Sequence, residues 1–425
     1  MDALLRQRIH ELLKHNSRTF DGFSYTVPSP TSYPYQWFWD SCFHAILWSH
    51  FDVPRAEAEL RSLVARQHDS GLIGHISYWE PHHVLQVDWG VPGTSNLLQP
   101  PLLAYAVWRI YERNQDVSFL AELYPTCKRY YDYIIAERDV RGVGLYGLIN
   151  PDESGEDTNP RFDADMELPH HHLVPDHLGK RFELFAVHRD CNLDARCSSE
   201  TFWVEDVAFN TYLQWNLGIM SDIAHRLGRI KEANTFTKQA SALKEAMRQH
   251  MLVNGVYRSV SGKTKEHATT DEWSQFVPMM AGLYTQSEAY QLVHKVLYDQ
   301  ERFWLPYGVP TVSALDPAFD PEEPTWGEAW QHPHWRGPIW ISQLWFIHKG
   351  LRRYGFNEAA HQIREQALHL VRSAGFREYY HPHTGKGMGA ESFSWGCLVI
   401  DMEHDHVNDV PSRLPIGDPA AIKFG

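Results

Sequence analysis

Five carboxylates fall within fifteen residues in the stretch INPDESGEDTNPRFD, at positions 149–163. A carboxyl group that is crowded by others has its pKa raised, which is the state that a general acid needs. Asp157 stands between Glu153, Glu156 and Asp163, so it is a candidate for such an acid. A solvated acidic loop is the simpler interpretation of any single one of them, and composition alone does not choose among these acids.

Aromatic, amide and basic side chains recur in the other segments that separate apolar stretches. Rings stack on the C–H faces of sugars, while carboxylates, amides and guanidinium groups bind the hydroxyls. We therefore expect a carbohydrate site. Its candidate binding residues are Tyr35, Trp39, Asp40, Asn96, Gln99, Arg161, Trp335, Arg336 and Trp340. Cleavage of a glycosidic bond needs a second carboxyl group opposite the acid, either to activate water or to attack directly.

Several of these candidates have a structural alternative. Trp335 and Trp340 could be core residues at the start of a helix, because an apolar stretch follows them. Asp40 could be a charge that complements a helix N-terminus. Asn96 and Gln99 could anchor their loop to the helix that begins near the two prolines after it.

Histidine-rich segments raise the alternative of a metal site. The chain contains PHHHLVPDH at 169–177, as well as HPHW and YHPH. Three consecutive histidines cannot all face one ion, and neither HExxH nor a two-histidine-one-carboxylate spacing occurs. The acidic segment 316–328 lacks the register of a calcium loop, and we interpret it as a solvated lid, with a structural ion left open. We expect no catalytic metal and no cofactor.

The bulk composition narrows the class of protein. The chain has 425 residues, a formal net charge of −14, 43% hydrophobic and 22% charged residues, as expected of a globular protein. The negative charge argues against a nucleic-acid or anionic-membrane partner. Neither a signal peptide nor a membrane span is evident. Five scattered cysteines favour reduced thiols and a cytoplasmic location. The oligomeric state stays open, a homo-oligomer included.

Apolar residues at a spacing of three to four predict about twelve helices. Gly228 and Gly355 suit left-handed caps at two helix ends. The expected ranges are 2–15, 38–53, 55–69, 99–114, 117–137, 203–227, 229–251, 271–283, 287–298, 335–355, 357–374 and 393–404. No long run alternates apolar and polar residues, so we expect an all-α protein with only small hairpins in its loops.

The connections between these helices alternate between tight turns and long loops. In sequentially antiparallel helices every second connection lies at the same end, so all the long loops should gather at one mouth. Six helical hairpins can close into an (α/α)6 barrel. A solenoid is the competing arrangement, but no repeat of fixed length occurs. We expect one domain over 1–425, with the loops 138–202 and 299–334 forming a lid over the site.

At this point several motifs resemble those of a known family. ESGEDTNPRF resembles the ESGxD-x-x-x-R segment of trehalases and glycoside hydrolase family 63, and WFWDS, NLLQPP, WRGPIW and ESFSW are similar to further signatures in the same order. The resemblance spans 33–400 and implies an (α/α)6 barrel that hydrolyses with inversion. It also implies that Asp157 is the general acid and Glu391 the general base, with the two carboxyl groups roughly 6.5–9.5 Å apart.

The compact bacterial branch of family 63, the mannosylglycerate and glucosylglycerate hydrolases, is the most similar in build. This resemblance implies cleavage of an α-mannosyl or α-glucosyl bond in a small glycoside. A glycerate carboxylate would need a cation, for which Arg189 and Arg196 are candidates. A trehalase-like or other α-glucosidase is the alternative, although Leu97 replaces the arginine of the trehalase pattern.

Two functions from other classes share this fold. A sugar isomerase or epimerase would use a pair of histidines as acid and base, and histidines are present in the loops. A sugar-binding protein would bind without turnover. The paired carboxylate motifs on separate loops favour hydrolysis over both.

Overall fold

The computed structural model describes residues 2–79, 93–172, 174–192, 194–322 and 334–403. Its α-helices are α1 (Ala3–Asn16), α2 (Phe38–Trp48), α3 (Val53–Val64), α4 (Leu103–Asn114), α5 (Val117–Glu137), α6 (Val174–Asp190), α7 (Ala195–Ser198), α8 (Val207–Arg226), α9 (Ile230–His250), α10 (Gln286–Leu292), α11 (Ile341–Arg353), α12 (Asn357–Ala374) and α13 (Val399–Glu403). Shorter helical turns are η1 (Pro151–Ser154), η2 (Pro160–Phe162), η3 (Trp273–Met279), η4 (Val293–Leu297) and η5 (Ser394–Leu398). Across these ranges, no helix has the length and apolar character that crossing a bilayer requires.

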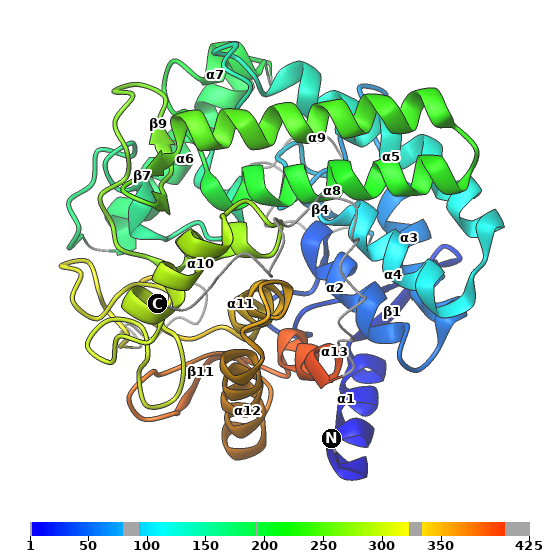
Figure 1. Ribbon diagram of the computed structural model, residues 1–425. Coiled ribbons are helices and arrows are strands. Elements are labelled where there is room, and N and C mark those ends of the chain that lie inside the picture. Colours follow the sequence, from blue (N-terminus) through cyan, green and yellow to red (C-terminus); the bar gives the residue numbers. More distant parts are fainter. Residues whose placement is uncertain (1, 80–92, 173, 193, 323–333, 404–425) are drawn as a thin grey trace.

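Six helical elements form an inner ring that closes on itself (Figure 1). Around the ring, α2 packs on α4, α4 on α8, α8 on η3, η3 on α11, α11 on η5, and η5 again on α2. Outer helices cover the inner ones in pairs: α3 packs on α2, α5 on α4, α9 on α8 and α12 on α11. The helix α10 follows η3 in the chain. The sixth pair consists of η5 and α1, which come from opposite ends of the chain and pack on each other. The fold is the predicted (α/α)6 barrel.

A buried aspartate ties the last helix into this ring. Asp401 of α13 accepts hydrogen bonds from Arg109 of α4 at 3.1 Å and from Trp345 of α11 at 2.8 Å, and Lys349 lies 3.1 Å away. Burial alone would raise the pKa of Asp401, but Lys349 and Arg109 hold it well below its ordinary value. The ionised carboxylate therefore joins α13 to two inner helices.

Local signals fix several helix ends. The side chain of Asp52 accepts a hydrogen bond from the backbone of Arg55 at 3.0 Å and begins α3. Asp206 caps α8 in the same way through Phe209 at 2.8 Å, since such caps satisfy free backbone N–H groups. Gly228, after the end of α8, has φ +73°, the left-handed conformation predicted for a cap.

Short antiparallel strands lie in the long loops, and two of the sheets join different loops. The antiparallel pairs are β1 (Ser17–Phe20) with β2 (Phe23–Thr26), β3 (Gln36–Trp37) with β4 (Ile76–Ser77), β7 (Leu252–Val253) with β8 (Val256–Tyr257), β10 (Arg377–Tyr380) with β11 (Gly387–Glu391), and the three strands β5 (Gly147–Leu148), β6 (Val204–Glu205) and β9 (Val260–Ser261). Because β3–β4 joins two loops and β5–β6–β9 joins two others, the loops meet at one end of the barrel, as predicted.

Three expectations about local structure need correction. The loop 138–202 contains two helices, α6 and α7, which lack the regular apolar stripe that reveals the barrel helices. The expected helix at 335–355 begins only at Ile341, because Pro338 and the extended residues before it cannot join the helix. The stretches expected as helices at 271–283 and 393–404 are largely or partly 3-10 turns.

The expectation of five reduced thiols is wrong for one pair. Cys191 and Cys197 form a disulfide, with their Cα atoms 5.6 Å apart. Cys191 follows the end of α6, and the turn into α7 returns the chain to it. The sequence showed no such pairing, because the separation of six residues matches no redox or metal motif. Cys42, Cys127 and Cys397 are free and buried.

Candidate active site

The carboxylates of the acid loop, residues 149–163, differ in burial and partners. Four of them are buried and each accepts a hydrogen bond from an arginine. The pairs are Asp152 with Arg181 (2.8 Å), Glu153 with Arg138 (2.7 Å), Glu156 with Arg161 (2.7 Å) and Asp163 with Arg336 (2.6 Å). Asp157 keeps 25% of its side chain exposed. The tertiary structure thus distinguishes Asp157, which is partly exposed, from its four buried acidic neighbours.

Two contacts position Asp157. Arg181 of α6 lies 3.0 Å from its carboxylate through Nη1, while Nη2 binds Asp152. Two residues before Asp157, Gly155 adopts φ +70°, and a Cβ atom there would lie only 2.6 Å from the ring of Trp39. The backbone of the acid loop therefore packs directly on a predicted sugar-binding tryptophan, which only glycine permits.

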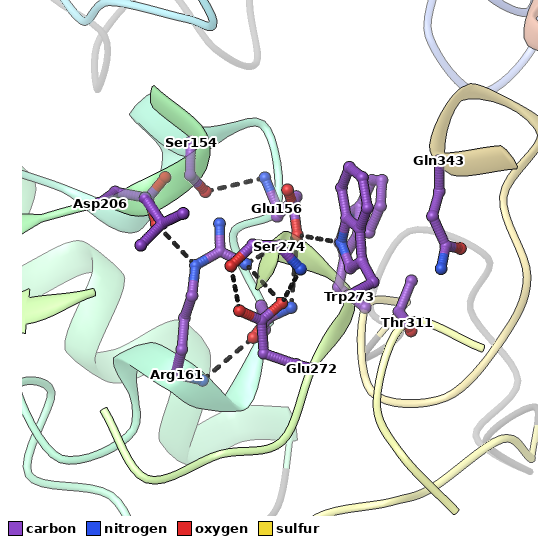
Figure 2. A network of polar contacts seen from close by, with 12 residues as sticks. Ser154, Glu156, Arg161, Asp206, Glu272, Trp273, Ser274, Thr311 and Gln343 are labelled. Atoms are coloured by element: carbon purple, nitrogen blue, oxygen red, sulfur yellow. Dashed lines mark hydrogen bonds and ion pairs between the residues drawn. The ribbon is translucent and has the colours of Figure 1, made fainter. Parts of the chain in front are cut away.

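Arg161 lies inside a buried network of three carboxylates (Figure 2). Its Nε donates to Asp206 at 2.7 Å, its Nη1 donates to Glu156 at 2.7 Å, and Glu272 lies 3.7 Å away. Burial raises the pKa of Glu156 and of Glu272, and a single cation serves all three acids. Arg161, a predicted hydroxyl ligand, is placed where it fixes the acid loop to α8 and η3.

Arg336, the other predicted arginine ligand, is also held within the protein. It forms a two-pronged contact with Asp163, at 3.0 and 2.6 Å, and donates to the backbone oxygen of Thr158 at 3.0 Å. Only 4% of its side chain is exposed. These contacts join the segment before α11 to the acid loop.

The predicted tryptophans form one aromatic cluster with Trp395. Trp335 and Trp340 stack with their ring centroids 4.1 Å apart, and Trp39 meets Trp395 edge-on at 4.8 Å. Trp340 and Trp395 lie 5.2 Å apart. All four rings are buried, so the structure brings together residues from three separate segments.

Asp40 stands beside this cluster. It accepts a hydrogen bond from Trp395 Nε1 at 2.6 Å and is 3% exposed. Burial raises the pKa of Asp40 to about 6, and the negative charge of Glu378 adds to this effect. Glu378 is therefore a further carboxylate of this site, and the sequence analysis did not single it out.

Glu378 of β10 is a buried carboxylate with a fixed orientation. Its Oε1 accepts a hydrogen bond from the hydroxyl of Tyr33 at 2.6 Å, and its Oε2 accepts one from the backbone of Ala390 at 2.7 Å. Burial raises the pKa of Tyr33 well above 10, and the charges of Glu378 and Asp157 raise it further. Tyr33 is therefore influenced by both carboxylates at once.

Glu391, the predicted general base, lies on the paired strand β11 but faces away from Tyr33. Its side chain is 78% exposed and contacts Arg377 at 2.7 Å. Arg377 and Glu391 are register partners across the hairpin, and Glu378 lies at a register shift between Arg377 and Tyr379. The hairpin therefore directs Glu378 inward and the Arg377–Glu391 pair toward solvent.

The remaining predicted ligands differ in their burial and contacts. Gln99 accepts a hydrogen bond from the backbone of Trp39 at 3.0 Å, so it holds its loop to the start of α2 and not to the helix after the two prolines. Tyr35 packs edge-on against Tyr78 at 5.3 Å, and Asn96 is buried. Arg189 and Arg196, the candidates for a carboxylate ligand, are exposed.

Sequence reasoning missed Glu378 and Arg181, and it considered His177 only as part of a histidine-rich segment. Glu378 follows no catalytic spacing in FREYYHPH, and β10 shows no alternation of burial that would have identified it. Arg181 and His177 lie on α6, which was expected to be loop. No cluster of three or more histidine, cysteine or carboxylate side chains suited to a metal occurs within the described part of the chain.

Comparison with known proteins shows the family to which the chain is similar. The family model described as mannosylglycerate hydrolase MGH1-like glycoside hydrolase domain matches residues 33–396. A mannosylglycerate hydrolase of Thermus thermophilus is 30% identical, covering 92% of this chain and 98% of the relative. A glucosylglycerate hydrolase of Mycolicibacterium hassiacum is 27% identical, covering 88% and 93%.

A solved structure extends the likeness to three dimensions. The crystal structure of the family 63 mannosylglycerate hydrolase from Thermus thermophilus in complex with Tris matches with a TM-score of 0.84 at 29% identity, covering 94% of this chain and all of the other. The chain therefore belongs to the mannosylglycerate hydrolase MGH1-like glycoside hydrolases of family 63, and it is a glycosidase.

Proposed function

We propose that this glycosidase hydrolyses the α-glycosidic bond of a hexosyl-glycerate, either mannosylglycerate or glucosylglycerate, with inversion at the anomeric carbon. The names of the relatives support the choice of substrate. The observation that carries the proposal is the position of Tyr33, which donates to Glu378 and is influenced by the charge of Asp157. Tyr33 thus contacts one carboxylate directly and is influenced by the charge of a second carboxylate from a distant segment.

In the proposed reaction Asp157 is the general acid. Its proton passes to the bridging oxygen as the bond between that oxygen and the anomeric carbon breaks. A water molecule attacks the opposite face of the sugar and loses a proton to the general base, so that free sugar and free glycerate result. Partial exposure suits Asp157 to this role, because a substrate can reach its carboxylate, whereas its four acidic neighbours in the loop are buried.

We propose Glu378 as the general base in place of Glu391. A base must be ionised and oriented toward the attacking water. Glu378 is 2% exposed, and both its oxygens are held by hydrogen bonds that leave further lone pairs for a water. Glu391 is 78% exposed and paired with Arg377, which suits a surface contact better.

Asp40 is the carboxylate that we propose for a sugar hydroxyl, with Trp39 and Trp395 bounding that part of the site. Arg161 and Arg336 act indirectly, because their hydrogen bonds fix the acid loop. The lid proposed for 138–202 contains α6, which supplies Arg181 to Asp157. Part of the second proposed lid, 323–333, lies outside the described residues.

Assay of the purified protein against mannosylglycerate, glucosylglycerate, trehalose and small α-glucosides tests the proposal. We expect turnover of a hexosyl-glycerate and little turnover of trehalose. NMR of the first-formed sugar should show the β-anomer, as inversion requires. Retention, or conversion of free mannose or glucose into another sugar, would contradict the assignment in favour of a covalent route or an isomerase.

We also retain the cytoplasm as the proposed location. Three free, buried cysteines support it, whereas the Cys191–Cys197 bridge speaks for an oxidising compartment. Cell fractionation with thiol trapping decides between them. The absence of nucleic-acid binding remains a prediction, which a mobility-shift assay can test, and size-exclusion chromatography can determine whether the protein forms a homo-oligomer.

A further inference from the structure

The buried network around Arg161 contains three carboxyl groups and one cation. Glu156, Asp206 and Glu272 lie 2.7, 2.7 and 3.7 Å from this guanidinium, and all three are buried. Within the described ranges, no second lysine or arginine forms an ion pair with any of them. If all three were ionised, the group would carry a net charge of −2. Buried charge without a partner is costly, so one carboxyl group should carry a proton.

Asp206 has the donors that an ionised carboxylate needs. It accepts hydrogen bonds from Arg161 at 2.7 Å, from the backbone of Phe209 at 2.8 Å and from the hydroxyl of Ser259 at 3.2 Å. Phe209 lies in the first turn of α8, where the helix dipole also favours a negative charge. The proton therefore belongs to the other two acids.

Glu156 and Glu272 have fewer donors. Oε1 of Glu156 has no hydrogen-bond partner among the described residues, while its Oε2 accepts from Arg161 and from Trp273 at 2.9 Å. In the same ranges, Glu272 accepts only from the hydroxyl and the backbone of Ser274. Burial raises the pKa of both acids, and the charge of Glu156 raises that of Glu272 further, to about 7. Such acids titrate as a pair.

The other titratable groups near this pair add no positive charge. Tyr212 of α8 faces the same network, and burial raises its pKa well above 10, so it stays neutral. Asp271 directly precedes Glu272 but is bound to Arg302 at 2.7 Å. Arg161 is therefore the one cation that stabilises negative charge on the pair within the described part of the chain.

The pair connects the acid loop to the inner ring. Glu156 directly precedes Asp157 in the chain, and Glu272 caps the start of η3. Figure 2 shows both side chains beside the guanidinium of Arg161. If both acids were ionised, their charges would repel and weaken the contact between the acid loop and η3. A shift of about 1 Å at a reacting group can lower the rate about 100-fold.

We propose that Glu156 and Glu272 share one proton, and that this proton holds the acid loop on η3 with Asp157 in position. Glu272 is then a positioning residue, because it acts on Asp157 through Glu156. The inference rests on the proposed role of Asp157 as general acid. As the pH rises the pair loses its proton, so part of the alkaline loss of activity comes from this pair.

Glu272→Gln tests the shared proton, since the amide keeps the shape of the side chain and stays uncharged at every pH. We expect kcat at pH 5 to stay within about 2-fold of wild type, and the alkaline midpoint of kcat to rise by about 0.5–1 pH unit. An unchanged midpoint would overturn the proposal. So would an inactive or unfolded variant at pH 5, because Glu272 would then be needed as a carboxylate.

Glu205→Gln is the matched control. Glu205 is also buried, burial raises its pKa to about 7, and it directly precedes Asp206, but it is bound to Arg141 at 2.7 Å. Its substitution should leave the alkaline midpoint of kcat unchanged. Glu272→Ala, which also removes the contact with Ser274, should lower kcat at every pH. Recovery by Gln at pH 5 then separates the charge of the side chain from its packing.

Urea unfolding detects the proton without turnover. Between pH 4.5 and 7 the folded protein retains this proton and the unfolded chain loses it. The free energy of unfolding of wild type should therefore fall relative to that of Glu272→Gln across this range, and the difference should be constant above it. Infrared spectra at pH 6 should show one protonated-carboxyl band fewer in the variant. A pH-independent difference in stability with identical bands would refute the shared proton.

Asp157→Asn distinguishes failure of this inference from failure of the proposed function. If Asp157→Asn keeps near-wild-type activity, Asp157 is not the general acid, but a band missing in Glu272→Gln still establishes the shared proton. If Asp157→Asn is inactive while Glu272→Gln keeps the wild-type midpoint, the assignment of the acid stands and the positioning role of Glu272 is refuted.

Discussion

The hydroxyl of Tyr33 lies 2.6 Å from Oε1 of Glu378 and donates a hydrogen bond to it. Tyr33 belongs to the loop before α2, and Glu378 lies on β10 near the other end of the chain. The contact depends on closure of the barrel, in which η5 packs against α2. The proposed base is consequently oriented by a residue from the opposite end of the sequence.

Substitution of the two glutamates on the β10–β11 hairpin should separate their roles. We expect Glu378→Gln to lower kcat by about two to four powers of ten, the usual scale of general base catalysis. Glu391→Gln should keep near-wild-type activity, because its carboxylate is exposed and contacts only Arg377 in the described structure. Steady-state kinetics of both variants, with thermal unfolding as the folding control, provides the measurement. Loss of activity in Glu391→Gln alone would return the role of base to that residue.

Two glycines with positive φ, Gly155 in the acid loop and Gly142 outside it, provide a test and a control for the positioning of Asp157. Gly155→Ala should lower kcat by about tenfold or more, because its Cβ atom would meet the Trp39 ring at 2.6 Å and displace Asp157. Gly142 has a similar φ of +66°, but nothing lies within 4 Å of the place that its Cβ atom would take. Gly142→Ala therefore bears only the backbone cost, about 1–2 kcal/mol. Kinetics and urea unfolding should show an activity loss specific to Gly155→Ala; equal kcat in the two variants would rule out this positioning role.

Stability should depend on pH through Asp40. Burial raises its folded-state pKa to about 6 from an ordinary value of 3.8, so the folded protein binds more protons than the unfolded chain between these values. The free energy of unfolding contributed by Asp40 therefore falls as pH rises from about 4 to 6 and is constant above that. The difference is on the order of 3 kcal/mol.

Asp40→Asn lacks this titration. Urea unfolding at pH 4, 5, 6 and 7 should show the variant gaining stability relative to wild type across this range. A constant difference between the two proteins would mean that Asp40 is ionised throughout. The same variant should bind substrate more weakly, since a neutral amide accepts hydrogen bonds less strongly than a carboxylate.

Removal of Arg161 should lower the free energy of unfolding rather than weaken substrate binding. Arg161→Met leaves Glu156, Asp206 and Glu272 without their shared cation, and an uncompensated buried charge costs about 3–5 kcal/mol. Arg189→Met is the control, because Arg189 is exposed and should change stability by less than about 0.5 kcal/mol. Urea unfolding measures both. Wild-type stability in Arg161→Met, together with a raised KM, would instead support direct substrate binding by Arg161.

The local pattern of the chain was enough to predict most of the barrel. Apolar spacing located the helices that form the ring, and the cap at Gly228 was correctly placed. These features are encoded within a few residues of one another, so one sequence reveals them. Helix α6 was missed for the same reason, since it packs with few apolar residues and gives little periodic signal.

By itself, the sequence determined the (α/α)6 architecture, the gathering of the long loops at one end, and the acid loop that contains Asp157. Only the tertiary structure decided which acid of that loop is exposed, which arginines are committed to internal ion pairs, and which glutamate of the last hairpin faces inward. Burial and charge partners depend on residues that are distant along the chain, as in the pairing of Arg336 with Asp163. The direction of a side chain on a strand depends on its register, which a short irregular strand does not reveal.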